Sequence, residues 1–113
     1  MPRDSKIYLE DILESILKIR QFTTGFDAAA FKTDPKTFDA VIRNLEIIGE
    51  AAKNLPESKK VRCAGVDWRK IAGLRDILAH QYFGIDAEIV WDIVQHKLID
   101  LEKCVRQLLA EDL

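Results

Sequence analysis

Residues 36–56, KTFDAVIRNLEIIGEAAKNLP, carry apolar side chains at every third or fourth position. That spacing places them on one face of an α-helix. Asp34 precedes the stretch as a helix cap, and Pro35 suits the first helical position. Residues 54–56 end it. The pattern predicts a long amphipathic helix, and its inward face consists of Phe38, Val41, Ile42, Leu45, Ile48 and Ala52.

The same spacing predicts another helix before this one. It is capped by Asp4 or Ser5, and residues 23–25 end it. Its apolar positions are Tyr8, Leu9, Ile12, Leu13, Ile16 and Ile19. Asp27 is expected to cap a short helical turn that leads into the long helix. Residues 57–66 have no clear pattern, so a loop and a short helix within it are both open.

Two further helices are predicted downstream. Asp67 caps one that runs to about Phe83, with Gly84 as its C-terminal stop, and Asp86 caps the last. The apolar residues of the last helix are Ile89, Ile93, Leu98, Leu101, Val105 and Leu108. No strand pattern, repeat or linker interrupts the chain. Residues 1–113 are therefore predicted to form one all-α domain, a bundle of four to five helices.

The composition limits the classes of protein that this chain can be. No apolar run approaches the roughly 20 residues of a membrane-spanning helix, and the first residues contain no signal-peptide core. We therefore expect a cytoplasmic protein. Cys63 and Cys104 stand apart, without a Cys-x-x-Cys pair. They predict two ordinary thiols in a reducing compartment, and neither a zinc site nor a redox dithiol.

Charge is distributed unevenly although the net charge is only −2. Residues 1–42 and 76–113 sum to −1 and −5, whereas residues 43–75 hold eight Lys and Arg against four Asp and Glu. A solvated surface and a surface that faces an anionic ligand both fit this pattern. The candidates for the second kind of surface are Arg43, Lys53, Lys59, Lys60, Arg62, Arg69 and Lys70.

A polar cluster lies within the apolar segment GLRDILAHQYFG, residues 73–84. On a continuous helix, Asp76 and His80 lie about 40° apart and share a face, whereas Arg75 and His80 lie about 140° apart. Tyr82 shares the direction of Arg75 two turns further on. One straight helix therefore does not bring all four groups to one site. Unwinding near His80 would do so, as would a second copy of the chain across a two-fold axis, and we favour the homodimer.

These residue types suit the cleavage of RNA without a metal ion. Histidine can take a proton from a 2′-hydroxyl or give one to the leaving 5′-oxygen, and the arginine fork matches phosphate geometry. Asp76 would orient the imidazole of His80. A structural interpretation stays open, in which Arg75 pairs with Asp76, His80 caps the helix and Tyr82 packs. A metal site at Asp76 and His80 is the weaker interpretation, because the sequence supplies no further ligands nearby. His96 is expected on a helix surface.

The spacing Arg75-x4-His80-x-Tyr82 resembles the Arg-x4-His-x-Tyr signature of HEPN-domain proteins, specifically the HepT toxins, also called the DUF86 family. The blocks RNLEIIGEAAKNLP, residues 43–56, and DWRKIAGLRDILAHQYFGID, residues 67–86, are similar to those of this family. The resemblance covers nearly the whole chain. It implies an antiparallel, HEPN-like helical bundle that forms a homodimer with both motifs in a shared cleft.

The resemblance also implies roles for the cluster. Arg75 and His80 would be the catalytic groups of a metal-independent endoribonuclease toxin, with Asp76 in support and RNA along the basic segment. Such toxins are paired, in type VII-like toxin–antitoxin systems, with a nucleotidyltransferase antitoxin, MntA. It neutralises the toxin by transferring AMP to the tyrosine that corresponds to Tyr82. No cofactor is implied. A non-catalytic helical subunit that binds a nucleotidyltransferase or a nucleotide is the alternative.

Overall fold

The computed structural model describes residues 4–80 and 86–111, with side chains for residues 4–74 and 86–111. In this described part the regular structure is entirely helical, and no helix is long and apolar enough to cross a membrane. In chain order the elements are α1 (Ser5–Thr23), α2 (Ala28–Lys32), α3 (Pro35–Asn54), α4 (Glu57–Lys60), α5 (Trp68–His80), α6 (Ala87–Asp92), the π-helix η1 (Ile93–Lys97) and α7 (Leu98–Glu111).

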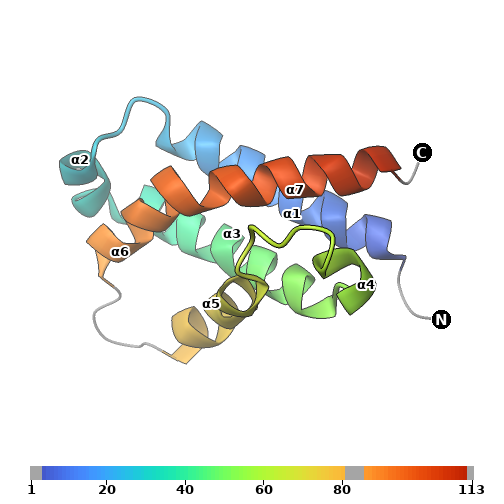
Figure 1. Cartoon of the computed structure of the whole chain (residues 1–113). Helices are drawn as coiled ribbons and strands as arrows, with labels where there is room; N and C mark the ends of the chain where they lie inside the picture. The colour runs from blue at the N-terminus through green and yellow to red at the C-terminus, as the bar shows by residue number, and fades with distance from the viewer. Residues whose placement is uncertain (1–3, 81–85, 112–113) are drawn as a thin grey trace.

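The long helices form a bundle in which α1 and α3 occupy the middle (Figure 1). α1 packs against both α3 and α7, and α5 packs against α3. The chain direction of α1 is opposite to that of α3 and of α7. The predicted all-α, antiparallel bundle is therefore confirmed, with α2 and α4 as short additional helices.

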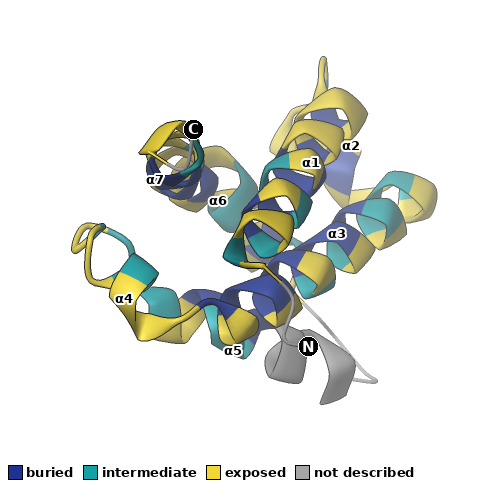
Figure 2. Cartoon of the chain, turned by 90° about the vertical axis from the view of Figure 1, so that its right-hand side faces the viewer, coloured by how far each residue is buried: buried dark blue, intermediate teal, exposed yellow. Residues whose placement is uncertain are grey.

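The core lies where these helices meet (Figure 2). Four of the six predicted inward residues of α3 are buried, and the other two, Phe38 and Ile42, pack against the core from its edge. Each fully buried aliphatic side chain contributes roughly 1.5–3 kcal/mol to folding. Fully buried examples from the three longest helical segments are Leu9, Ile12, Ile16, Val41, Leu45, Ile48, Leu101, Val105 and Leu108.

Aspartate caps begin the helices where the sequence predicts them. Each cap uses a carboxylate oxygen to accept a hydrogen bond from a backbone N–H of the first turn, which satisfies a donor that the helix itself leaves free. The distances are 3.0 Å from Asp4 to Lys6, 2.8 Å from Asp27 to Ala30, 3.2 Å from Asp34 to Thr37, 3.2 Å from Asp67 to Lys70 and 2.9 Å from Asp86 to Glu88.

The last helical segment departs from the prediction of a continuous α-helix. Residues 93–97 form the π-helix η1, which places an extra residue in the turn. Ile89, predicted on the apolar face, is 61% exposed, and its neighbour Val90 is buried instead. The expectation for Ile89 is therefore wrong, because the face of α6 that packs toward α2 and the core carries Val90.

Cys63 and Cys104 form a disulfide, so the prediction of two separate thiols is wrong. Their Cα atoms lie 5.9 Å apart although 41 positions separate them in the sequence. The bond joins the segment between α4 and α5 to α7. An ion pair of 2.8 Å between Arg62 and Glu111 makes a second link between the same two parts. No local spacing could reveal this pairing, because it depends on how the segment lies against α7.

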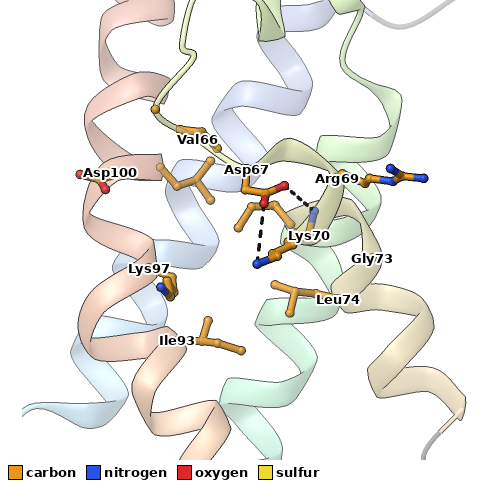
Figure 3. A pocket seen from close by; sticks show the side chains of 12 residues that line it. Val66, Asp67, Arg69, Lys70, Gly73, Leu74, Ile93, Lys97 and Asp100 are labelled. Atoms are coloured by element: carbon orange, nitrogen blue, oxygen red, sulfur yellow. Dashed lines mark hydrogen bonds and ion pairs between the residues drawn. The ribbon is translucent and has the colours of Figure 1, made fainter.

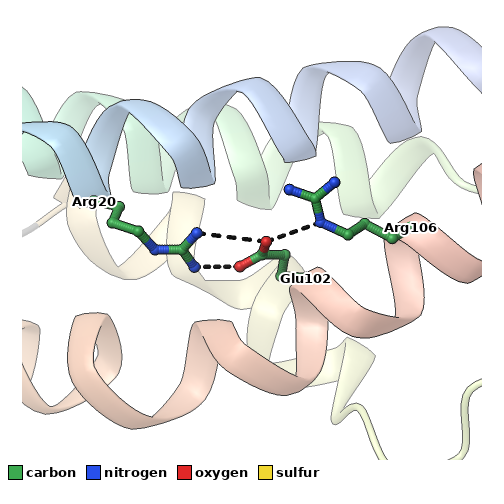
Figure 4. A network of polar contacts seen from close by, with 3 residues as sticks. All are labelled: Arg20, Glu102 and Arg106. Carbon is green, nitrogen blue, oxygen red and sulfur yellow. Dashed lines mark hydrogen bonds and ion pairs between the residues drawn. The ribbon is translucent and has the colours of Figure 1, made fainter.

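A polar network connects α1 to α7 (Figure 4). Arg20 of α1 donates two hydrogen bonds to the carboxylate of Glu102, and Arg106 Nε donates a third at 2.9 Å. The bond from Arg20 is the main reason that the pKa of Glu102 lies below its ordinary value, and burial opposes this effect. The same bond raises the pKa of Arg20. Since Glu102 is charged more readily in the folded chain, the network favours folding at neutral pH.

Reduction of the disulfide is expected to lower the free energy of unfolding by about 4 kcal/mol, because the bond restricts a loop of this length in the unfolded chain. Urea unfolding with and without a dithiol measures the difference. A double Cys63→Ser, Cys104→Ser variant is the control and should be insensitive to the dithiol. Equal stability of the oxidised and reduced wild type would contradict the prediction.

Glu102→Gln is expected to destabilise the fold by about 1 kcal/mol at pH 7, a modest value because Arg20 is half exposed. A carboxylate with a lowered folded-state pKa stabilises the fold above its unfolded pKa, about 4.3, and loses this effect as the pH falls through the folded pKa. The difference between variant and wild type should therefore shrink toward pH 3.

Thermal unfolding across this pH range measures the effect. Glu14→Gln is the matched control, because Glu14 forms a 3.1 Å ion pair with Lys18 on the exposed side of α1. It should change stability less than Glu102→Gln does. A pH-independent effect of Glu102→Gln would show that the carboxylate charge is not its cause.

Candidate functional site

The helix α5 carries the first part of the predicted motif. Arg75, Asp76 and His80 lie on its backbone, which stays α-helical through His80. Asp76 and His80 are therefore one helical turn apart, as predicted from their spacing. The side chains of these three residues, and the whole of Tyr82, lie outside the described residues. Convergence of the four groups on one site stays a prediction.

The N-terminal half of α5 is anchored on the rest of the molecule. Ile71 and Leu74 are buried against the core, and α5 packs along α3. Trp68 Nε1 donates a hydrogen bond of 3.1 Å to the backbone carbonyl of Lys60, which ties the start of α5 to α4. The backbone that bears Arg75 follows directly on this anchored half. The position of the motif is therefore set by apolar contacts made one or two turns earlier.

The predicted RNA-facing residues are spread over three elements and the segment after α4. Arg43 and Lys53 are exposed on α3, about 15 Å apart along its axis. Lys59 and Lys60 lie on α4, and Arg62 follows in the segment that leads to α5. The guanidinium of Arg62 is engaged by Glu111, so it is the candidate most clearly committed to a contact within the chain.

Two of the candidates, Arg69 and Lys70, line a pocket between α5 and the η1–α7 segment (Figure 3). Its volume is about 640 Å³, within the range of ordinary ligand sites. Lys70 lies toward the middle of the pocket, 3.9 Å from Asp67, whereas Arg69 extends away from it. The apolar part of the lining includes Val66, Ile71, Leu74, Ile93 and Leu101.

Lys97 lines the same pocket from the opposite wall, and the sequence analysis did not single it out. It is exposed, and no carboxylate in the part of the chain that the structure describes forms an ion pair with it. Lys97 belongs to the acidic last third of the chain. The net charge of its segment therefore does not indicate that Lys97 belongs to a cationic site. Its place in the pocket follows only from the packing of η1 opposite α5.

The second histidine does not line this pocket. His96 is exposed and its Nε2 lies 3.8 Å from the carboxylate of Asp92 on the preceding turn, so the prediction of a helix-surface residue is confirmed. Among residues 4–74 and 86–111, no three His, Cys, Asp or Glu side chains gather in a way that could hold a metal ion.

Comparison with known proteins identifies the class to which this helical chain belongs. A family model described as "Ribonuclease HepT-like" matches residues 12–108. The chain therefore belongs to the HepT-like ribonuclease family, and the resemblance stated from the sequence is confirmed.

Two relatives illustrate the match. The chain is 45% identical to "Probable ribonuclease HepT" of Thermococcus cleftensis, over 90% of this chain and 93% of that protein. It is 44% identical to "Putative RNase MJ0127" of Methanocaldococcus jannaschii, over 99% of this chain and 97% of that protein. No solved structure matches the chain. The similarity thus extends over essentially the full length of both relatives, so it covers α1 as well as the motif-bearing α5.

Proposed function

We propose that this protein is a metal-independent endoribonuclease, the toxin of a type VII-like toxin–antitoxin pair, with Arg75 and His80 as its catalytic groups. One observation carries the proposal: a chain of the HepT-like ribonuclease family has the Arg-x4-His spacing on α5. The proposed substrate is cellular RNA, and we place the protein in the cytoplasm, where that RNA is found.

The chemistry follows from the residue types. In RNA the 2′-oxygen attacks the neighbouring phosphorus, the P–O bond to the 5′-oxygen breaks, the 2′-hydroxyl loses a proton and the leaving 5′-oxygen gains one. Histidine near its pKa can serve either proton transfer, and a guanidinium can hold the charged phosphoryl oxygens. Asp76, one turn before His80, would orient the imidazole and favour its protonated form.

Two protomers would divide these tasks. Positions 75 and 80 lie about 140° apart around a regular helix, and α5 is helical through His80. A two-fold axis would place the His80 of each copy in one cleft, so that one imidazole acts as base and the other as acid. We therefore propose that the active form is a homodimer.

Tyr82 is the proposed site of control. A cognate nucleotidyltransferase antitoxin of the MntA type would transfer AMP from ATP to the tyrosine hydroxyl, with release of pyrophosphate. Tyr82 follows Arg75 by seven positions, so a helix that continued past His80 would carry both on one side. The attached phosphate would then lie near the arginine that must receive RNA phosphate, and the nucleotide would fill the cleft.

The ribonuclease proposal is tested by incubating the unmodified protein with total cellular RNA in EDTA. The wild type should cleave, whereas Arg75→Ala and His80→Ala should be slower by about 100-fold or more, because each loses a group that acts on the reacting phosphate. His96→Ala is the matched control, since it removes the second, exposed histidine. It should cleave like the wild type.

The opposite results are equally clear. Cleavage by folded, dimeric His80→Ala at the wild-type rate would reject His80 as a catalytic group. Absence of cleavage by every protein, with Tyr82 free of AMP, would favour the alternative of a non-catalytic subunit that binds a nucleotidyltransferase or a nucleotide.

The modification is tested by peptide mass spectrometry after co-expression with the proposed nucleotidyltransferase antitoxin. AMP should be found on the peptide that contains Tyr82 and should be absent from Tyr8, the other tyrosine of the chain. Tyr82→Phe should remain toxic when the partner is present, because it has no hydroxyl to accept the phosphoryl group. A neutralised toxin with unmodified Tyr82 would overturn the proposal.

A further inference from the structure

The pocket between α5 and α7 has features that the catalytic proposal does not use. Its floor is apolar, and two lysines enter it from opposite walls, Lys70 from α5 and Lys97 from η1 (Figure 3). Asp67, which also lines the pocket, is already engaged as the cap of α5 and as a 3.9 Å partner of Lys70. Asp100 extends away from the middle of the pocket.

We infer that this pocket is a substrate subsite that takes one nucleotide of a single-stranded RNA, with its base on the apolar floor and its phosphate between Lys70 and Lys97. The inference rests on the proposed ribonuclease function, since that function presents RNA to α5. Single-stranded RNA is commonly bound in this way, by cations that hold the backbone and apolar surfaces that hold unstacked bases.

The position of the pocket relative to the motif supports this choice of occupant. Lys70 precedes Arg75 by five residues and His80 by ten, which corresponds to roughly 7–15 Å along α5. A stacked strand rises about 3.4 Å per nucleotide, so the subsite would lie about two to four nucleotides from the cut. By helical register, Gly73 lies about 20° from position 80 and about 60° from position 76, and Lys70 lies about 80° from position 80. The edge of the pocket at Gly73 therefore shares a side of α5 with position 80, whereas position 75 lies about 140° from Lys70.

A substitution at Gly73 can test whether the pocket binds a nucleotide. It lines the cavity, and a Cβ atom built on it meets no atom within 4 Å. Gly73→Leu should therefore fill part of the space without a clash at the backbone. Lys97→Ala removes a cation that holds no ion pair with the described residues and leaves the core unchanged. Lys103→Ala is the matched control, because Lys103 is exposed on α7 and does not line the pocket.

The measurement is fluorescence anisotropy with a labelled 12-nucleotide 2′-O-methyl RNA, which lacks the attacking hydroxyl and is not cut. Lys97→Ala should weaken binding about fivefold, and the slope of log K against log salt should become less steep by about 0.7, the value for one phosphate contact in a single strand. Gly73→Leu should also weaken binding about fivefold, and Lys103→Ala should bind like the wild type.

Two results would overturn the nucleotide subsite, and a third would distinguish it from the proposed ribonuclease function. Equal binding by Lys97→Ala and Lys103→Ala overturns the subsite. Loss of the dimer in Gly73→Leu, measured by analytical ultracentrifugation, shows that the pocket is an interface between copies and overturns it as well. Binding that depends on Lys97, together with no cleavage of unmodified RNA by the wild type, upholds the site and rejects the proposed ribonuclease function.

Discussion

Burial of the apolar face of α3 is the contact on which the rest of the molecule depends. Leu45 and Ile48 are fully buried, and α3 packs against both α1 and α5. α5 adds Ile71 and Leu74 to the same core, so the helix that bears the motif is located by α3. Apolar contacts of this kind do not by themselves determine at which residue a helix begins. The aspartate cap at Asp67 and the bond from Trp68 to α4 fix where α5 begins.

The helices could be predicted largely because their signals are local. Asp34 caps α3 through a bond to Thr37, three residues away, and such a bond is visible as spacing in the sequence. The two errors have non-local causes. Val90 rather than Ile89 is buried because of how α6 packs against α2, and the disulfide joins Cys63 to Cys104 across most of the second half of the chain. Neither follows from the residues that adjoin it.

The same distinction applies to the candidate site. The spacing of Arg75, Asp76 and His80 is local, so the sequence identifies the motif and predicts the helix on which the structure places it. Lys97 enters the region only because η1 lies opposite α5, and it comes from a part of the chain whose net charge is negative. Arg62 is the opposite case, a predicted RNA-facing cation that forms an ion pair within the chain. It was counted among the cations that face RNA, yet it lies 2.8 Å from Glu111.

α5 thus combines two kinds of environment along one helix. Its first two turns are fixed by burial, by the cap and by the contact with α4, and they form one wall of the pocket. Arg75, Asp76 and His80 follow on the same helix. A substrate held by the first part would be presented to the second in a defined register, because a helix transmits position without bending over so short a length. Under the proposed function, catalytic groups on a free loop would lack that register, so burial of Ile71 and Leu74 would position the motif as well as complete the core.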